Sequence, residues 1–202
     1  KPSGIAVHGG SGVAYGLIEA LRAATGKKYL ELIHRIDRDT SGLVMISKKR
    51  STLKLVQDLL REHKIQKTYA AIVKGQVSLD QQLIDAPLFR YELANGERRV
   101  RVSKEGKPSK TEWNVVERFK AATLVHASPL SGRTHQIRVH GLSIGHPLIG
   151  DDKYGHSTAY AGPEARRLCL HAMRLQIPGY PTIEAPMPED MQQVLNELRK
   201  QK

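Results

Sequence analysis

Apolar side chains along this sequence recur at two different spacings, and each spacing predicts one kind of element. Helical spacing is found from residue 17, over 51–61, over 134–143 and from Pro188 onward, where a proline suits the first helical turn. The side chains expected to face inward from the first, second and last of these helices are Leu17, Ile18, Leu21, Leu53, Val56, Leu59, Leu60, Val194, Leu195 and Leu198.

Short apolar or alternating runs bounded by glycine, proline and asparagine predict strands between the helices. The clearest run is 68–73, which ends at Gly75, and Asn95-Gly96 marks a turn before a basic strand. Strands joined by hairpins, with few helices between them, favour an α+β fold with a mixed, mainly antiparallel sheet. The expected strands are 4–8, 43–46, 68–73, 98–102, 113–119, 122–128, 173–177 and 182–185.

The size of the chain predicts a single domain. With 202 residues and 40% hydrophobic content, it is large enough for a substantial core, and we expect one globular domain over residues 1–202. Two small domains are the alternative. Cys169 is the single cysteine, which excludes an internal disulfide and a thiolate zinc site. No apolar run approaches the ~20 residues of a membrane span, and no signal peptide is visible. We therefore expect a cytoplasmic protein, with a monomer as the default.

The balance of charge indicates a polyanionic partner. Lys and Arg number 32 against 20 Asp and Glu, which gives a formal net charge of +12 and a pI of about 9.9. No amphipathic basic helix stands apart from the predicted fold, so nucleic acid is favoured over a membrane surface.

The segment 34–42 is the densest cluster of charge, with His34, Arg35, Asp37, Arg38 and Asp39 between two apolar runs. Desolvation raises the pKa of a carboxylate and neighbouring arginines lower it, so such a segment can hold an ionised Asp in a poorly hydrated place. That is the state which a nucleophile or general base needs. On charge density alone, a solvated loop of ion pairs is the alternative.

The segment His34-Arg35-Ile36-Asp37-Arg38-Asp39-Thr40-Ser41-Gly42 resembles the signature of the RluA-type pseudouridine synthases, with Ile36 where the family has leucine. Further resemblances follow in the family's order and cover essentially the whole chain. Residues 8–12 and 106–109 are also similar to members of the family that act on large-subunit (23S) ribosomal RNA. The other matching segments are residues 1–8, 67–70, 132–140, 150–155 and 167–172.

This resemblance implies a curved central sheet with a catalytic cleft across it, and the isomerisation of uridine to pseudouridine without a cofactor or metal. The reaction breaks the N1 glycosidic bond, turns the uracil and rejoins it through C5. The resemblance assigns the essential carboxylate to Asp37, its buried ion-pair partner to Arg138 and the active-site tyrosine to Tyr69. Asp37 acts either by covalent attack or by removing the 2′ proton. Taken alone, Tyr69 is an ordinary strand aromatic.

Recognition of stacked RNA requires that the target nucleotide be flipped out, at a cost of a few kcal/mol. By resemblance, Arg35 enters the vacated stack and Leu170 forms part of an apolar wall at the site. An ion pair with Asp39 is the alternative for Arg35, and plain core is the alternative for Leu170. The RNA-binding residues are expected to include Arg38, Lys67 and Arg133, and further phosphate contacts are expected from Arg98, Arg99, Arg101, Lys104, Lys107 and Lys110.

Two other classes of function stay open at this stage. Asp37 and Asp39 could hold a divalent metal ion, since hard cations favour paired carboxylates, although two flanking arginines oppose it. His135 and His140 lack the i, i+4 spacing of a helical zinc pair. The chain could instead be a non-catalytic protein that binds ribosomal RNA, in which Asp37 is idle.

The sequence starts inside one of the matching motifs, at Lys1-Pro2. We therefore expect additional sequence upstream, where the family often carries a small S4-type RNA-binding domain.

Overall fold

The computed structural model describes residues 1–10 and 14–201, so Ser11 and Gly12 of the matching segment 8–12 lie outside the described residues. The chain divides into two compact units. The first consists of Lys1–Lys67 and Ala172–Ala185, and the second of Thr68–His171 and Pro186–Lys202. Each is described by itself below, and the single domain expected over residues 1–202 stays a prediction.

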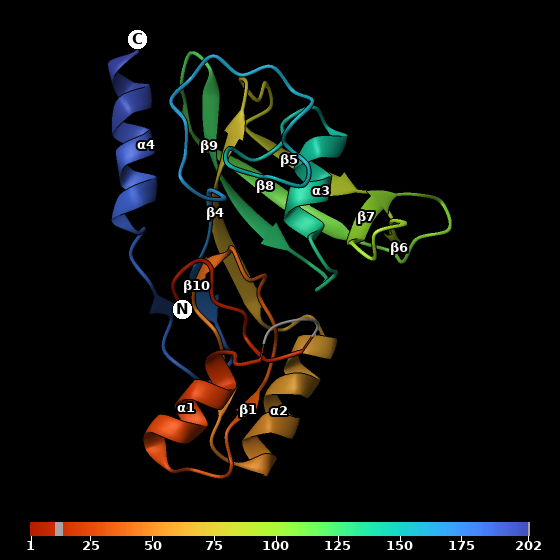
Figure 1. Cartoon of the computed structure of the whole chain (residues 1–202), viewed down its shortest axis with the longest axis vertical. Coiled ribbons are helices and arrows are strands. Elements are labelled where there is room, and N and C mark those ends of the chain that lie inside the picture. Colours follow the sequence, from red (N-terminus) through yellow and green to blue (C-terminus); the bar gives the residue numbers. More distant parts are fainter. Residues whose placement is uncertain (11–13, 202) are drawn as a thin grey trace. The chain divides into compact units, whose positions relative to one another are not determined.

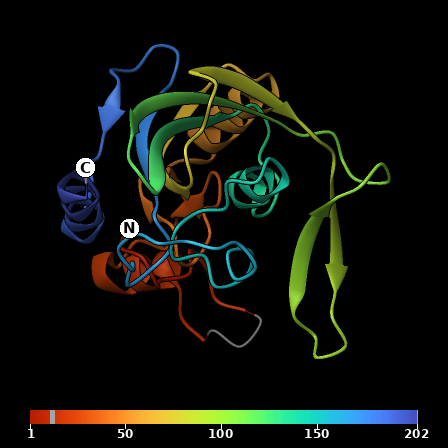
Figure 2. The ribbon, with the colours of Figure 1, turned by 90° about the horizontal axis from the view of Figure 1, so that it is seen from above.

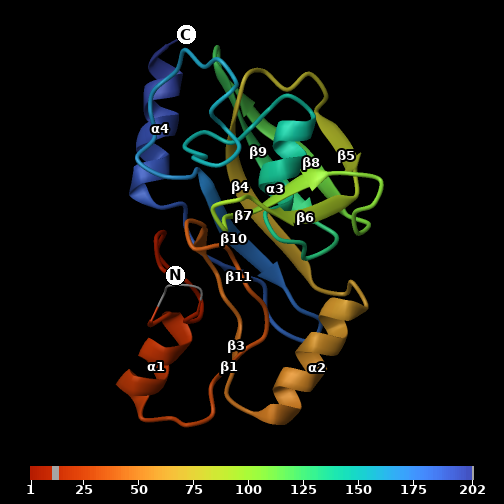
Figure 3. The same ribbon diagram turned by 45° about the vertical axis from the view of Figure 1, so that its right-hand side comes forward.

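The first unit combines helices with very short strands. In Figure 3, α1 and α2 lie on either side of the antiparallel β1–β3 pair. Strands β10 and β11 also pair in an antiparallel manner. The bounds are α1 Leu17–Thr25, β1 Glu31–Leu32, β2 Ser41–Gly42, β3 Ile46–Ser47, α2 Arg50–Arg61, β10 Leu170–Gln176 and β11 Ile183–Glu184.

One apolar cluster holds the first unit together. Val56 is the buried residue of α2, and Met45 and Leu175 meet it from segments far apart in the sequence. Burying a side chain of this size contributes about 1.5–3 kcal/mol, so the cluster fixes α2 against the strands. Its members are Met45, Val56, Ile65 and Leu175, with Ile33, Leu43, Leu59, Leu60 and Ile177 packed against them.

Four strands of the second unit pair in the order β4-β9-β8-β5, and each neighbouring pair is antiparallel. A separate antiparallel ribbon is formed by β6 and β7. Figures 1 and 2 show the sheet curving around α3, while the ribbon extends to one side of it. The bounds are β4 Gln66–Lys74, β5 Gln81–Asp85, β6 Leu88–Glu92, β7 Arg98–Val102, β8 Lys110–Arg118, β9 Ala122–Pro129, α3 Gln136–Ser143 and α4 Glu189–Lys200.

The core of the second unit is centred on β4. Residues 68–73 are buried without a break, the pattern of a strand covered on both faces. Trp113 of β8 and Leu148 are almost completely inaccessible. A smaller cluster joins the β6–β7 ribbon to α3 through Leu88, Val100, Val139 and Tyr154. Helix α3 is therefore held between the sheet and the ribbon, which fixes the side chains that it carries.

The predicted α+β class with mainly antiparallel pairing is confirmed, and so are three of the predicted helices, the hairpin of β8 and β9, and the basic strand 98–102. The predicted strand over 4–8 is wrong. Backbone N–H groups at the start of α1 use the carbonyls of Ala6 and Val7 as acceptors, with N to O distances of 2.9 and 3.1 Å. This segment therefore completes a helix end instead of pairing in a sheet.

Two other predicted boundaries are also wrong. The run 43–46 is not one strand, because Gly42 ends β2 and β3 starts only at Ile46. Helix α3 begins at Gln136, and His135 before it has a left-handed backbone with φ of 52°. The Gln136 side chain accepts hydrogen bonds from the Arg133 N–H (3.1 Å) and the Ser131 hydroxyl (2.7 Å), which stabilises a turn there. Thr134 thus lies outside the helix.

No helix in the described ranges is both long and apolar enough to cross a bilayer.

Gly42 lies where a side chain has no room. Its φ is 115°, and a Cβ atom would lie 2.2 Å from the carbonyl oxygen of Ala172. We expect Gly42→Ala to lower the free energy of unfolding by about 3 kcal/mol or more, because left-handed strain and a backbone clash add together. Urea denaturation measures this loss.

Gly26→Ala is the matched control, because Gly26 also has a positive φ, 64°, but a Cβ there would meet nothing within 4 Å. It should cost about 1 kcal/mol, the strain term alone. Equal losses in the two variants would show that the clash at Gly42 is relieved.

Candidate functional site

The segment 34–42 of the first unit is held in place through its backbone. The Gly4 N–H donates to the Arg38 carbonyl at 2.9 Å, and the Ser3 hydroxyl donates to the Asp39 carbonyl at 2.6 Å. The Thr40 N–H closes a turn onto the carbonyl of Asp37 at 3.2 Å. These hydrogen bonds, two between backbone groups and one from the Ser3 hydroxyl, fix the turn on which the half-buried Asp37 stands.

The charges of this segment separate into paired and exposed groups. Arg38 Nε donates to the carboxylate of Asp39 at 3.1 Å. Arg35 is exposed, and across residues 1–10 and 14–201 it makes no ion pair with Asp39. The ion pair with Asp39 that was the alternative for Arg35 is therefore wrong, because Asp39 pairs with Arg38.

His34 lies at the base of the segment as a neutral imidazole. Its Nε2 accepts a hydrogen bond from the Met45 N–H at 2.9 Å, which a protonated ring could not do. Burial, with a smaller contribution from the positive charge of Lys67, lowers the pKa of His34 to about 4. Burial also lowers the pKa of the half-buried Lys67. His34 thus supports the backbone after β2 and carries no charge near neutrality.

Arg138, in the second unit, is 2% exposed and is gripped by Asp151 through two hydrogen bonds. The distances are 2.8 Å from Nε to Oδ2 and 2.7 Å from Nη2 to Oδ1. Oδ1 also accepts the N–H groups of Lys153 and Tyr154. Burial alone would raise the pKa of Asp151, but the bonds and charge of Arg138, with these N–H groups, bring it below its ordinary value.

Asp151 is a residue whose role sequence reasoning missed. It stands in the segment Gly150-Asp151-Asp152-Lys153-Tyr154-Gly155, which resembles the family but to which no function was assigned. The one feature of the sequence that could have drawn attention to Asp151 is its place in a short acidic segment bounded by Gly150 and Gly155. The spacing along the chain does not indicate Arg138 as its partner.

Tyr69 and Leu170 are both buried in the second unit. Tyr69 is 8% exposed on β4, opposite Ala127 of β9. Leu170 is 3% exposed, and its carbonyl accepts a hydrogen bond from Arg167 Nη1 at 3.3 Å. Burial suits a tyrosine that packs on a base and a leucine in an apolar wall, and it suits plain core equally well.

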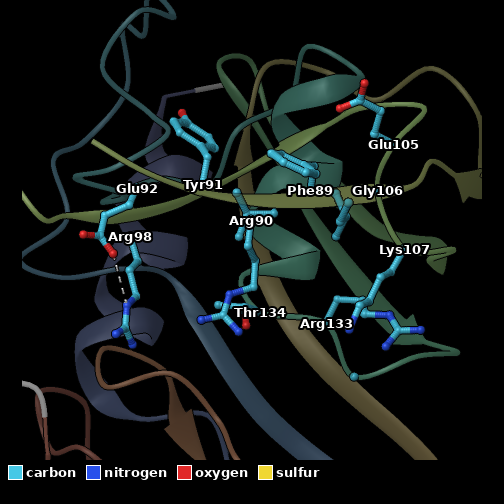
Figure 4. Close-up of a pocket in the computed structure, with 13 residues that line it drawn as sticks. Phe89, Arg90, Tyr91, Glu92, Arg98, Glu105, Gly106, Lys107, Arg133 and Thr134 are labelled. Carbon is cyan, nitrogen blue, oxygen red and sulfur yellow. Dashed lines mark ion pairs between the residues drawn. The ribbon is translucent and has the colours of Figure 1, made fainter. Parts of the chain in front are cut away.

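A basic pocket of about 640 Å³ lies between the β6–β7 ribbon and residues 132–134. In Figure 4, Arg90 and Arg98 extend from the ribbon in one direction, and Phe89 and Tyr91 extend in the other. Arg133 lies across the pocket from the ribbon. Glu92 is 3.8 Å from Arg98 and offsets part of this charge. The lining residues are Leu88, Phe89, Arg90, Tyr91, Glu92, Arg98, Val100, Glu105, Gly106, Lys107, Gly132, Arg133 and Thr134.

The predicted phosphate-binding residues divide between this pocket and internal contacts. Arg98, Lys107 and Arg133 line the pocket, as does Arg90, which sequence reasoning did not single out. Lys110 pairs with Asp85 at 3.0 Å, and Arg99 pairs with Glu97 at 3.2 Å. Arg101 lies over the rings of Phe89 and Tyr91.

The predicted pair of Asp37 with Arg138 joins one residue of each unit and stays a prediction. The described part of the chain contains no group of three or more His, Cys, Asp or Glu side chains arranged to hold a metal ion.

Comparison with known proteins gives a consistent result. A family model described as "RNA pseudouridylate synthase" matches residues 1–143. The chain is 48% identical over 211 residues to "Ribosomal large subunit pseudouridine synthase C" of Pasteurella multocida, covering 100% of this chain and 65% of that protein. It is 50% identical over 210 residues to the protein of the same name from Escherichia coli K12, covering 98% of this chain and 66% of that protein.

Among solved structures, "Human RNA Pseudouridylate Synthase Domain Containing 4" matches with a TM-score of 0.77 at 26% identity, covering 98% of this chain and 88% of that one. The chain thus spans about two thirds of the length of the bacterial relatives.

The lowered pKa of His34 predicts a loss of stability in acid. Since the pKa falls from 6.5 to about 4 on folding, neutral His34 stabilises the fold above pH 6.5, and this contribution disappears as the pH falls toward 4. We expect His34→Gln, whose amide oxygen can accept from the same N–H, to reduce this pH dependence by up to about 3 kcal/mol. Urea denaturation of both proteins between pH 7 and pH 4.5 measures it.

His156→Gln changes an exposed histidine in the same way and should leave the pH dependence of the wild type intact. Parallel curves for wild type and His34→Gln would mean that His34 protonates without cost in the folded protein.

Proposed function

The chain belongs to the RNA pseudouridylate synthase family, and on that premise we propose that it converts uridines of large-subunit ribosomal RNA to pseudouridine. The observation that carries the proposal is Asp37, which occupies the acidic position of the family signature and stands on a turn fixed by backbone hydrogen bonds. The substrate class is proposed from the bacterial relatives, whose name contains "Ribosomal large subunit". Such an enzyme works in the cytoplasm.

In the proposed reaction, the Asp37 carboxylate acts near the ribose of the target uridine. It either attacks covalently or takes the 2′ proton, and both routes need an ionised oxygen. Arg138 is the proposed partner that keeps it ionised. A guanidinium has five N–H donors, so the bidentate bond with Asp151 is compatible with a second carboxylate on Arg138. Tyr69 packs on the base and is the candidate that takes the C5 proton. No cofactor enters these steps.

Arg35 is the proposed side chain that fills the stack when the target nucleotide leaves it. The exposure of Arg35 supports this role. The ion pair of Asp39 with Arg38 also supports it, because the Asp39 carboxylate is not paired with Arg35. A planar guanidinium stacks on bases well and thereby offsets part of the cost of base flipping. Leu170 would exclude water from the flipped base.

The basic pocket is the proposed contact for the RNA backbone, together with Arg38 and Lys67. Arg90, Arg98 and Arg133 bring three guanidiniums to one cavity, and guanidiniums bind phosphate through paired hydrogen bonds. Such contacts position RNA without reading its sequence, so we propose that this part of the protein contributes affinity more than choice of site.

Asp37→Asn should abolish pseudouridine formation and leave RNA affinity within about twofold of wild type. Asparagine keeps the size of aspartate but supplies neither a nucleophilic nor a basic oxygen, so both routes fail. Large-subunit RNA transcribed without modification is incubated with each protein, and pseudouridines are mapped as carbodiimide adducts by primer extension.

Asp39→Asn is the internal control for this experiment. It removes the ion pair with Arg38 and should lower activity while leaving turnover measurable. Inactive Asp39→Asn together with active Asp37→Asn would move the chemistry to Asp39. Loss of activity in both variants, reproduced by a chelator, would favour a metal site, and an inactive wild type that still binds RNA would favour a non-catalytic binding protein.

RNA affinity should fall steeply with salt. If about five phosphates are neutralised, the log–log slope of the association constant against salt is about −3 to −5. Arg90→Gln and Arg98→Gln should each make that slope shallower by about 1. Filter binding between 50 and 200 mM salt gives the slope.

Arg174→Gln removes an exposed arginine outside the pocket, one that pairs with Glu184, and should leave the slope unchanged. If it changed the slope as much as Arg98→Gln does, RNA binding would depend on net charge rather than on the pocket.

A further inference from the structure

The tight turn 150–155, between α3 and β10, is shaped by two glycines. Gly150 has φ of 75°, and a Cβ there would lie 2.0 Å from the Arg167 carbonyl oxygen. A Cβ on Gly155 would lie 2.6 Å from the Asp151 carbonyl oxygen. The chain can therefore fold back closely enough for one carboxylate oxygen of Asp151 to accept the N–H groups of both Lys153 and Tyr154, at 2.9 and 3.0 Å.

One side of this turn holds Arg138. Asp151 binds the guanidinium at two atoms, and the Tyr154 ring lies beneath it, with the guanidinium carbon 5.1 Å from the ring centroid. The carboxylate fixes the plane of the guanidinium and the ring limits its tilt. Arg138 is thus oriented by two neighbouring groups from a single turn.

The other side of the turn holds the β6–β7 ribbon. The Tyr154 hydroxyl accepts the Val100 N–H at 3.0 Å and shares a hydrogen bond with His135 Nδ1 at 2.7 Å. The Lys153 carbonyl accepts from Arg99 Nη1 at 3.0 Å, and Lys153 Nζ pairs with Glu97 at 3.0 Å. Three contacts therefore fasten β7 and the residue before it to the same turn.

We propose that the turn 150–155 is a positioning element with two arms, in which Asp151 orients Arg138 for the reaction and Tyr154 sets the ribbon that lines the RNA-binding pocket. This inference rests on the proposed function, because it assigns a role to Arg138 and to the pocket in pseudouridine formation. Neither Asp151 nor Tyr154 touches the substrate in this scheme, and both act through other residues.

The energetics of the pair support positioning over simple stabilisation. The side chains of Arg138 and Asp151 are 2% and 0% exposed, so both charges have lost their water. A buried pair of this kind is often no more stabilising than apolar residues of the same volume, because desolvation offsets the attraction. What the pair does provide is a fixed direction for the guanidinium, which an apolar replacement could not supply.

The first arm is tested with Asp151→Asn. The amide keeps the size of the side chain but has only one oxygen that can accept a hydrogen bond from the guanidinium. With one of its two bonds lost, the guanidinium of Arg138 can rotate. Because small misplacements of reacting groups are costly, we expect kcat on unmodified large-subunit RNA to fall about 100-fold, with KM within about twofold of wild type. Glu117→Gln is the control, since it removes the carboxylate from another bidentate pair, with Arg199, and should leave kcat unchanged.

Asp151→Glu distinguishes orientation from charge. It keeps the negative charge and moves it by one methylene group, so a purely electrostatic role would retain wild-type kcat and a positioning role would not. We expect kcat below wild type by about tenfold or more. Wild-type kcat in either Asp151 variant, or the failure of both to fold as judged by circular dichroism, would overturn the assignment of Asp151 as a positioning residue.

The second arm is tested with Tyr154→Phe, which keeps the ring beneath Arg138 and deletes only the hydroxyl. The ribbon loses its bond at Val100, so we expect KM for RNA to rise roughly fivefold, with kcat within about twofold of wild type. Tyr160→Phe deletes a hydroxyl that donates to the Pro163 carbonyl and should change neither constant. An unchanged KM in Tyr154→Phe, or equal changes in Tyr160→Phe, would overturn this arm.

These outcomes are separate from the test of the proposed function. If wild-type protein forms no pseudouridine, the proposed function fails and no kcat can be compared. If wild type is active but the Asp151 variants do not lower kcat, or Tyr154→Phe does not raise KM, the proposed function stands and the positioning element is overturned.

Discussion

The ion pair between Arg138 and Asp151 is the interaction on which the second unit's candidate chemistry depends. It places two opposite charges in a nearly inaccessible position, which is tolerated because each polar atom of the carboxylate has a partner. Arg138 lies on α3, and the neighbouring Val139 packs against Leu88 and Val100 of the β6–β7 ribbon. Apolar packing thus fixes the helix and with it the backbone of Arg138, and the ion pair fixes the guanidinium of the same residue.

Asp37 is fixed by a different physical means. Its turn is held by hydrogen bonds among backbone groups and by the Ser3 hydroxyl. Hydrogen bonds between backbone groups stay the same while a carboxylate reacts, so the turn can keep its shape through the proposed reaction. Arg138, the proposed supporting cation, is held through its side chain and stays charged throughout. The division of labour between backbone and side-chain support follows from what each group does in the proposed reaction.

Much of this arrangement could be predicted from the sequence, and the failures have common physical causes. Helices α1, α2 and α4 and the hairpin of β8 and β9 were predicted because their apolar spacing matches the elements that they form. Residues 4–8 look like a strand by composition, yet their carbonyls are used by the start of α1. Helix α3 begins two residues later than predicted, since His135 adopts a left-handed backbone that the periodicity does not reveal. The role of Asp151 was missed because a contact between a turn and a helix leaves no local pattern.

The net charge of +12 is a poor guide to the number of cations available to RNA. Arg99 and Lys110 are engaged by carboxylates, and Arg101 lies over two aromatic rings, although all three belong to the basic segment 98–110. Arg90, which stands outside that segment, lines the pocket. Alternation along a strand explains the difference, because neighbouring residues face opposite sides. The side chains of Arg90 and Arg98 extend from the ribbon in one direction, while those of Phe89 and Tyr91 extend in the other and lie beneath Arg101. One ribbon therefore uses its cations for two purposes: Arg90 and Arg98 line the pocket, and Arg101 lies over the two aromatic rings.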